Sequence, residues 1–147
     1  MRSWPLGKIH GSVYSERFAA GHIPWGARLD GDLAHVSWTA HGSLAIDELA
    51  RLVFFPNTTT IVYDVFTREQ YRGHALFTRT LSEIARVHFE NGGEEVVVYA
   101  ERRNIPSRAS IRNAGGVECA SSICFQLGKM RLMLKSPRTV FKHVETL

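Results

Sequence analysis

The sequence is poor in residues that form covalent or metal crosslinks. Its 147 residues include two cysteines, Cys119 and Cys124, which lie five positions apart on an expected strand, so their side chains would point to opposite faces. The seven histidines show no metal-ligand spacing with these cysteines. We therefore expect neither a disulfide nor a metal site, and we expect a reduced, cytoplasmic protein.

Long apolar runs and flexible spacers are also missing. No run approaches the roughly 18 apolar residues of a membrane helix, and residues 1–5 do not begin a signal peptide. No Pro-, Gly- or Ser-rich linker, repeat or low-complexity run divides the chain. These absences predict one domain over residues 1–147, without membrane contact and with a loose or partner-bound tail at 137–147.

The excess of positive charge is modest. The net charge is +4 and the isoelectric point is near 9.4, which permits nucleic-acid binding without requiring it. The arginines are dispersed along the chain rather than gathered in one block. We therefore do not expect a nucleic-acid partner.

The strongest pattern that is present reads strand, turn, helix, strand. Residues 59–66 and 94–100 are rich in β-branched and aromatic side chains, as strands are. The residues between them have helical periodicity, and residues 91–93, Asn-Gly-Gly, supply a stop. The apolar positions of this helix are Ala75, Leu76, Leu81, Ile84, Ala85 and Phe89. The pattern predicts a βαβ unit, whose strands are parallel.

A polar turn at residues 69–74 connects the first strand to the helix. Unpaired backbone N–H groups gather where a turn opens a helix, and such groups attract anions, especially phosphates. By itself this turn is a generic anion site.

Weaker patterns surround the βαβ unit. Apolar runs at 25–29 and 33–39 flank Asp-Gly-Asp and predict a hairpin, and runs at 117–127 and 130–134 predict a second one. Residues 9–14 suit a strand, whereas residues 46–55 fit either a helix or a strand. Residues 105–114 suit a short helix that ends at Gly115-Gly116.

Three intervals give the turn a more specific meaning. They separate Arg72 from Gly92, Arg72 from Asn104, and Asn104 from Gly115. In these intervals the sequence resembles the GNAT superfamily of acyl-coenzyme A N-acyltransferases, most closely over residues 61–116. The resemblance implies an α/β fold with a mixed central sheet, a splayed parallel strand pair and flanking helices, built around a core at 59–116.

The resemblance also implies a coenzyme A site, with acetyl-coenzyme A as the cosubstrate. The pyrophosphate would lie on the turn amides, and the pantetheine arm would run along the first parallel strand. Asn104 either contacts the cofactor or caps the short helix, and both readings can hold together. Arg102, Arg103, Arg108 and Arg112 would either hold the 3′-phosphate or solvate a face. The cofactor residues implied are Val65, Phe66, Thr67, Arg72, Gly73, His74, Ala75, Leu76, Phe77, Asn104 and Ser107.

The turn departs from the family pattern at two positions. Ala75 replaces a glycine, which backbone binding tolerates if φ stays negative, and Phe77 replaces a small residue and must point away from the phosphates. A second register that begins at Gln70 also satisfies the motif, and it predicts overlapping amides.

The catalytic residues are less well marked. Ile111 occupies the position where the family often has a Tyr that acts as the general acid, and Gly116 occupies that of a Phe. The usual proton donor is therefore absent. We expect Tyr99 to be the candidate general acid in its place. Ser107, Ser110 and Cys119 also lie near the expected site. Asp64 or Tyr63 is the candidate base; because side chains alternate along a strand, at most one of them would face the substrate, and Asp64 is preferred.

These observations imply an N-acyltransferase that moves an acyl group, most simply acetyl, from its coenzyme A thioester to an amine by direct attack. The acceptor would be a small-molecule or peptide amine. The alternative is a non-catalytic coenzyme A-binding or protein-interaction module of the same fold. Few residues precede the first hairpin, so the acceptor site is open, or a partner subunit, as in a homodimer, or a missing segment completes it.

Overall fold

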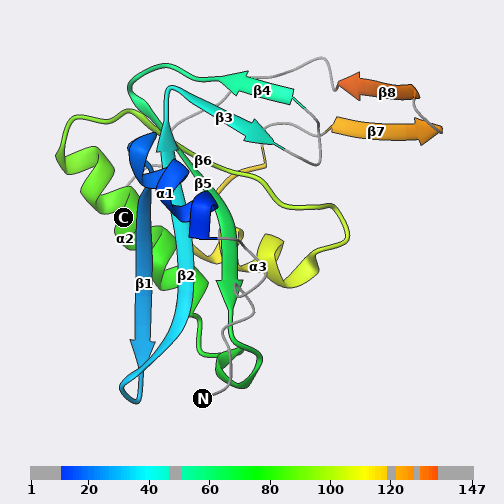
Figure 1. The fold of residues 1–147 in the computed structure, drawn as a ribbon. Coiled ribbons are helices and arrows are strands. Elements are labelled where there is room, and N and C mark those ends of the chain that lie inside the picture. Colours follow the sequence, from blue (N-terminus) through cyan, green and yellow to red (C-terminus); the bar gives the residue numbers. More distant parts are fainter. Residues whose placement is uncertain (1–10, 47–50, 119–121, 128–129, 136–147) are drawn as a thin grey trace.

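A four-stranded sheet forms the centre of the molecule (Figure 1). The computed structural model describes residues 11–46, 51–118, 122–127 and 130–135. The sheet has the order β1-β2-β5-β6, and its strands are β1 (Ile23–Leu29), β2 (Asp32–His41), β5 (Thr59–Thr67) and β6 (Glu95–Val98). β2 is antiparallel to both β1 and β5, whereas β5 and β6 are parallel. The predicted mixed α/β sheet is therefore confirmed.

The hairpin of β1 and β2 turns through two residues, Asp30 and Gly31. Both have positive φ, 53° and 84°, and Leu29 pairs directly with Asp32. Positive φ at both central positions is the signature of the tight turn whose twist matches two antiparallel strands. The Asp-Gly signal in the sequence therefore marks this hairpin correctly.

The predicted βαβ unit is present. The helix α2 (Leu76–Glu90) connects β5 to β6, and Gly92, with φ of 82°, ends it. The next residue, Gly93, lies so close to His88 that a Cβ atom there would be 2.2 Å from the imidazole Nε2. Glycine at this position allows the chain to turn tightly into β6.

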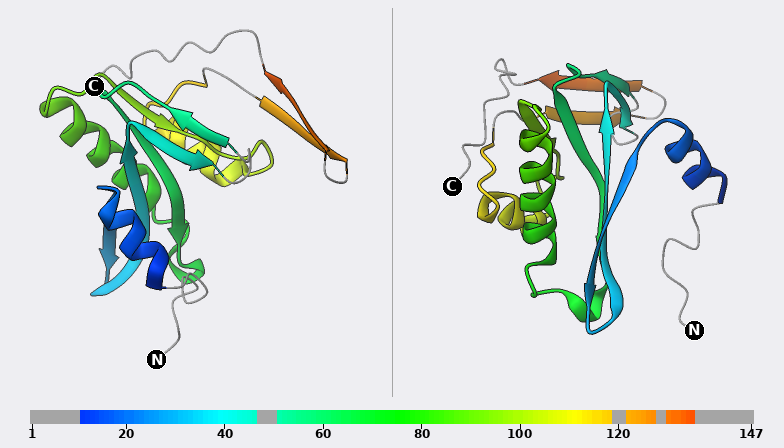
Figure 2. Two further views of the ribbon diagram at one scale, coloured as in Figure 1. Left: turned by 45° about the horizontal axis from the view of Figure 1, so that its top comes forward. Right: turned by 90° about the vertical axis from the view of Figure 1, so that its left-hand side faces the viewer.

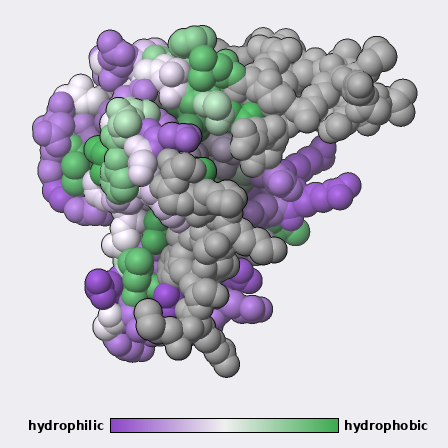
Figure 3. All heavy atoms as spheres, viewed as in Figure 1, coloured by the Kyte–Doolittle hydropathy of each residue, from purple (hydrophilic) through white to green (hydrophobic). Residues whose placement is uncertain are grey.

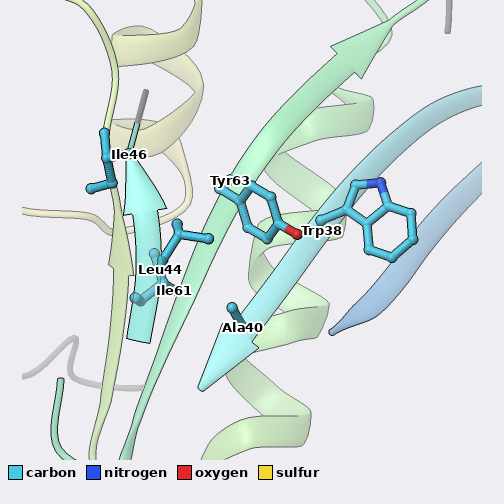
Figure 4. Packing of buried hydrophobic residues seen from close by; sticks show 6 residues of the cluster. All are labelled: Trp38, Ala40, Leu44, Ile46, Ile61 and Tyr63. Atoms are coloured by element: carbon cyan, nitrogen blue, oxygen red, sulfur yellow. The ribbon is translucent and has the colours of Figure 1, made fainter. Parts of the chain in front are cut away.

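The two faces of the sheet carry separate apolar clusters. On one face, α2 and α3 (Ile105–Asn113) cover a cluster that includes Val62, Phe77, Leu81 and Ile84. On the opposite face, Trp38, Ala40, Leu44, Ile46, Ile61 and Tyr63 form the second cluster (Figure 4). This second face is the one on which α1 (Gly11–Ala19) lies, as the right-hand view of Figure 2 shows.

Two sequence expectations change in the N-terminal half. The strand expected at 9–14 is wrong where it is described, because Gly11–Ala19 forms the helix α1. Tyr14 and Phe18, one helical turn apart, both contact Trp38, and this packing outweighs the strand propensity of the segment. The ambiguous segment at 46–55 contains a strand, since β4 (Arg51–Phe54) pairs with β3 (Ser43–Ile46).

The end of β4 exposes apolar side chains. Figure 3 shows apolar residues gathered at the top of the view around this strand, where Leu52 and Phe54 are 56% and 74% exposed. A patch of this kind suits a contact with another molecule. The expected homodimer stays a prediction.

The predicted C-terminal hairpin is present. Strands β7 (Ser122–Leu127) and β8 (Met130–Lys135) are antiparallel and form a two-stranded sheet of their own, away from the central sheet (Figures 1 and 2). Cys124 lies in β7, whereas Cys119 and the tail at 137–147 lie outside the described residues. The expectations for the cysteine pair and for the tail therefore stay untested.

Candidate functional site

The parallel strands β5 and β6 separate from each other halfway along β5. Their pairing ends at Val62 and Val98, and β5 continues to Thr67 with no described strand paired on that side. The N–H of Arg68 bonds the carbonyl of Ala34 in β2 at 3.0 Å. Because main-chain groups alternate between the two edges of a strand, the polar groups of Thr67 and Val65 face the open edge. The splay expected from the sequence is therefore present.

The turn after β5 presents a row of free amides. A single 3-10 turn, η3 (Glu69–Tyr71), precedes it, and Arg72 approaches the Thr67 carbonyl through Nε at 3.4 Å. The backbone N–H groups of residues 73–78 have no acceptor among the described residues. Gly73 and Ala75 have positive φ, 85° and 54°. A backbone whose φ alternates in sign gathers its N–H groups into a concave nest that suits an anion.

Ala75 corrects one expectation. Alanine was expected to be tolerated here on condition that its φ stayed negative, but the residue is left-handed, because it ends the nest and starts α2 as the N-cap. It supplies no side-chain cap, so the amides of the first helical turn stay open to a ligand.

Phe77 points away from the turn, as expected. It is 8% exposed and lies in the core beneath α2, where its ring stacks on His35 at 5.8 Å between centroids. His35 is fully buried and contacts the hydroxyls of Thr67 and Ser37 at 2.7 and 2.8 Å. Burial lowers the pKa of His35 from 6.5 to about 4, so this imidazole is neutral at pH 7. The side chains beneath the turn are thus buried and uncharged.

Asn104 caps the helix α3. Its Oδ1 accepts the N–H of Ser107 at 3.1 Å, and Pro106 lies in the first turn. The capping interpretation is confirmed, and a cofactor contact of Asn104 or Ser107 stays a prediction. Ile111 packs beside the Val62 cluster, which gives this residue a structural place in the core.

Asp64 lies in a β-bulge of β5. Val36 pairs with Phe66 and Trp38 pairs with Tyr63, so two residues of β5 oppose one of β2. Asp64 itself has a φ of 46°. The bulge breaks the alternation of side chains, and Arg17 of α1 contacts both Asp64 and the ring of Tyr63. The expectation that Tyr63 and Asp64 face opposite sides is therefore wrong.

Arg17 neutralises the proposed base. Its Nη1 lies 2.6 Å from Oδ2 of Asp64, and the two side chains are 17% and 31% exposed. The carboxylate of Asp64 is therefore already engaged by a cation and is not free to take up the acceptor's proton without breaking this contact. Asp64 is thus an ion-pair partner in this structure.

A tyrosine and a histidine lie beside this ion pair. The hydroxyl of Tyr63 and Nδ1 of His22 are 2.7 Å apart. Burial, above all, raises the pKa of Tyr63 to about 12, so the phenol keeps its proton at neutral pH. Burial, followed by the charge of Arg17, lowers the pKa of His22, so the imidazole is neutral there. The pair therefore combines a proton donor with a proton acceptor, and the sequence reading missed His22 and Arg17.

Tyr99, the other proposed catalytic residue, comes directly after β6 and is 38% exposed. Continuing the strand register would place it across the splay from Tyr63. Its catalytic role stays a prediction.

The larger cavity lies elsewhere. It has a volume of about 320 Å³ and is lined by residues near the C-terminal end of α2 and the start of β1, among them Trp25, His41, His88 and Asn91. It borders neither the free amides nor Arg17, so its size alone does not identify the site. A second gap of about 30 Å³ separates α2, α3 and β6.

In the parts of the chain that the structure describes, no three His, Cys, Asp or Glu side chains are grouped as metal ligands would be. None of the described helices has the length and apolar character needed to cross a membrane.

The sequence matches no protein-family model and no curated protein, but several solved structures match the fold. Ribosomal-protein-alanine N-acetyltransferase from Brucella melitensis aligns with a TM-score of 0.59 and 17% identity, over 90% of this chain and 76% of its own. AAC(6')-Iy in complex with the bisubstrate analog CoA-S-monomethyl-acetylneamine aligns with a TM-score of 0.59 and 13% identity, over 78% and 77%. A GNAT-family acetyltransferase from Staphylococcus aureus Mu50 aligns with a TM-score of 0.53 and 10% identity, over 85% and 67%. The chain therefore has the GNAT acetyltransferase fold.

Proposed function

We propose that this protein is an N-acyltransferase that moves an acyl group, most simply acetyl, from its coenzyme A thioester to an amine. The observation that carries the proposal is the row of free amides at residues 73–78, placed next to the open edge of β5. Solved structures of the same fold are acetyltransferases, and one of them holds a coenzyme A analog. The two features together fit a phosphate group joined to an extended arm.

The coenzyme would extend from the free amides of the turn along the open edge of β5. Its pyrophosphate would bind the free amides of residues 73–78, where the dipole of α2 contributes about 0.3–1 kcal/mol. The Arg72 amide, which the sequence prediction included, already bonds the Glu69 carbonyl at 3.2 Å. Arg72, an exposed side chain beside the turn, would add a charged contact. The pantetheine arm would take the place of the missing partner of β5, bonding the main chain of residues 65–67. The thioester would then reach the splay beside Tyr63.

The reaction needs a neutral amine and a protonated leaving group. The amine nitrogen attacks the thioester carbonyl carbon, the C–S bond breaks, and the proton of the amine passes to the neutral imidazole of His22. Tyr63, which carries its proton at neutral pH, protonates the departing thiolate and regains a proton from His22. Protons balance over the cycle, and Asp64, whose carboxylate bonds Arg17 in the structure, takes no part in the proton transfer.

Thermal unfolding with and without acetyl-coenzyme A tests the binding step. A bound ligand raises the melting temperature in proportion to the logarithm of its concentration above Kd. Gly73→Asp introduces a negative charge at the free amides and should abolish the shift. Gly42→Asp is the matched control, since both glycines have positive φ and open space around a Cβ. A wild-type protein that shows no shift at millimolar acetyl-coenzyme A would contradict the proposal.

Release of free thiol in the presence of a panel of amines tests the chemical step separately. We expect release that depends on both the amine and acetyl-coenzyme A. A thermal shift without thiol release from any amine would instead favour the non-catalytic coenzyme A-binding module.

A further inference from the structure

The carboxylate of Asp64 and two aromatic rings enclose one cation. The Cζ atom of Arg17 lies 4.9 Å from the ring centroid of Trp38 and 5.1 Å from that of Tyr63. The two rings come from paired positions of β2 and β5, and Figure 4 shows them on the same face with the Tyr63 hydroxyl directed toward Trp38. The bulge turns Asp64 to this face, where it bonds the same guanidinium. Ring faces and a carboxylate are together a specific cation site.

The cation that fills this site comes from outside the sheet. Arg17 belongs to α1, a nine-residue helix at the outside of the sheet, which contacts Trp38 through Tyr14 and Phe18 (Figure 2). A helix of this length is not stable by itself in water. Gly21, with φ of 77°, connects α1 to β1, and Phe18 on the same helix is 58% exposed. The sheet residues of the site are thus fixed, whereas the element that supplies the cation is short and peripheral.

The site lies where an acceptor must arrive. Tyr63 and Asp64 are the first residues of β5 beyond its last pair with β6. The cation therefore lies at the point where β5 and β6 begin to separate, which we call the mouth of the splay. The proton acceptor His22 is bonded to Tyr63 at 2.7 Å. Trp38 is 2% exposed, and its indole N–H has no hydrogen-bond partner within the described parts of the chain.

We propose that the acceptor is a cationic amine, and that its cationic group binds Asp64, Tyr63 and Trp38 in the place that Arg17 holds in the free protein. This inference rests on the proposed acyl transfer. An anionic acceptor bound by Arg17 fits less well, because the Arg17 side chain is 17% exposed and its guanidinium already bonds a carboxylate and covers two rings. Displacement of Arg17 by the acceptor uncovers the site beside the thioester.

Chemical rescue of Arg17→Gln tests the cation site without activity. Guanidinium at low millimolar concentration should raise the melting temperature of this variant, and urea, its neutral analogue, should not. Wild-type protein and the exposed-arginine control Arg28→Gln should show no rise with guanidinium, and Asp64→Asn added to Arg17→Gln should abolish it. A folded Arg17→Gln that responds equally to guanidinium and urea would overturn the proposal.

A second measurement uses the wild-type protein, in case Arg17→Gln fails to fold. The indole N–H signal of Trp38, assigned with Trp38→Phe, should move on titration with agmatine or cadaverine and stay unmoved with β-alanine. No movement with either diamine would overturn the proposal. The acetyl-coenzyme A thermal shift distinguishes failure of this inference from failure of the proposed function. A normal thermal shift without a response to the cations rejects this inference alone. The absence of a thermal shift rejects the proposed function.

Discussion

Arg17 and Asp64 form an ion pair of 2.6 Å although 47 residues separate them along the chain. The pair connects the peripheral helix α1 to the bulge at the mouth of the splay. Both side chains are more buried than exposed, so their charges are weakly screened. The pair therefore joins the stability of α1 to the electrostatics of the proposed acceptor site.

The first prediction concerns the coupling of these two charges. Arg17→Gln leaves the carboxylate of Asp64 without its counter-charge. Asp64→Asn likewise leaves the guanidinium of Arg17 without its counter-charge. We expect a coupling free energy of about 2 kcal/mol in a double-mutant cycle measured by urea denaturation. Additive losses in the double variant would show that the contact contributes nothing to stability.

The second prediction concerns the backbone at Ala75. A left-handed conformation is unfavourable for alanine, and glycine adopts it freely. Ala75→Gly should therefore raise the free energy of unfolding by about 1 kcal/mol. Ala85→Gly, within the same helix but with ordinary helical backbone, is the control and should lower it by about 1 kcal/mol. Equal losses in both variants would contradict the left-handed assignment.

The third prediction concerns acid stability through His35. Its folded pKa, about 4, lies below the unfolded value of 6.5, so the unfolded chain binds a proton that the folded protein refuses. The corresponding stability is complete above pH 6.5 and is lost as the pH falls toward 4, by about 3 kcal/mol in total. Urea denaturation across this range in wild type and His35→Gln checks the slope. A variant whose stability falls as steeply as that of wild type would exclude His35 as the cause.

The fourth prediction concerns the proton-transfer pair. Tyr63→Phe keeps the ring and removes the hydroxyl, and it should lower kcat by about 10²-fold while the acetyl-coenzyme A thermal shift is preserved. Because the pKa of His22 is lowered, the acidic limb of the kcat profile should lie below pH 6.5 and should vanish in His22→Gln. Unchanged kcat in Tyr63→Phe would remove this pair from the mechanism. Tyr99→Phe, tested beside it, decides whether Tyr99 contributes.

Local sequence signals predict much of the fold. The Asp-Gly turn between β1 and β2, the stop at Gly92 and the cap at Asn104 each depend on one or two residues whose backbone preferences are strong. The βαβ unit follows from periodicity over a longer window. These features need no knowledge of the rest of the chain, which is why the sequence alone reveals them.

The arrangement of the acceptor side depends on contacts that no local pattern encodes. The bulge at Asp64 changes which face its side chain meets, and a strand pattern assumes strict alternation. Arg17 and His22 acquire their roles from Tyr63 and Asp64, far along the chain. One signal was available: Tyr14 and Phe18 share a helical face, which suggests a helix lying on an apolar surface. Ala75 shows the same limit, since its left-handed φ follows from the nest around it.

The central claim is that the free amides of residues 73–78 hold the phosphates of a coenzyme A thioester. Titration of ¹⁵N-labelled protein with acetyl-coenzyme A measures this directly, because hydrogen bonding to phosphate changes the chemical shift of the amide that donates. The account predicts saturable shifts at residues 73–78, with the signals of Asn57 and Gly93 at the 320 Å³ cavity unmoved. Unchanged signals at 73–78 with millimolar ligand, or shifts confined to the cavity, would contradict it.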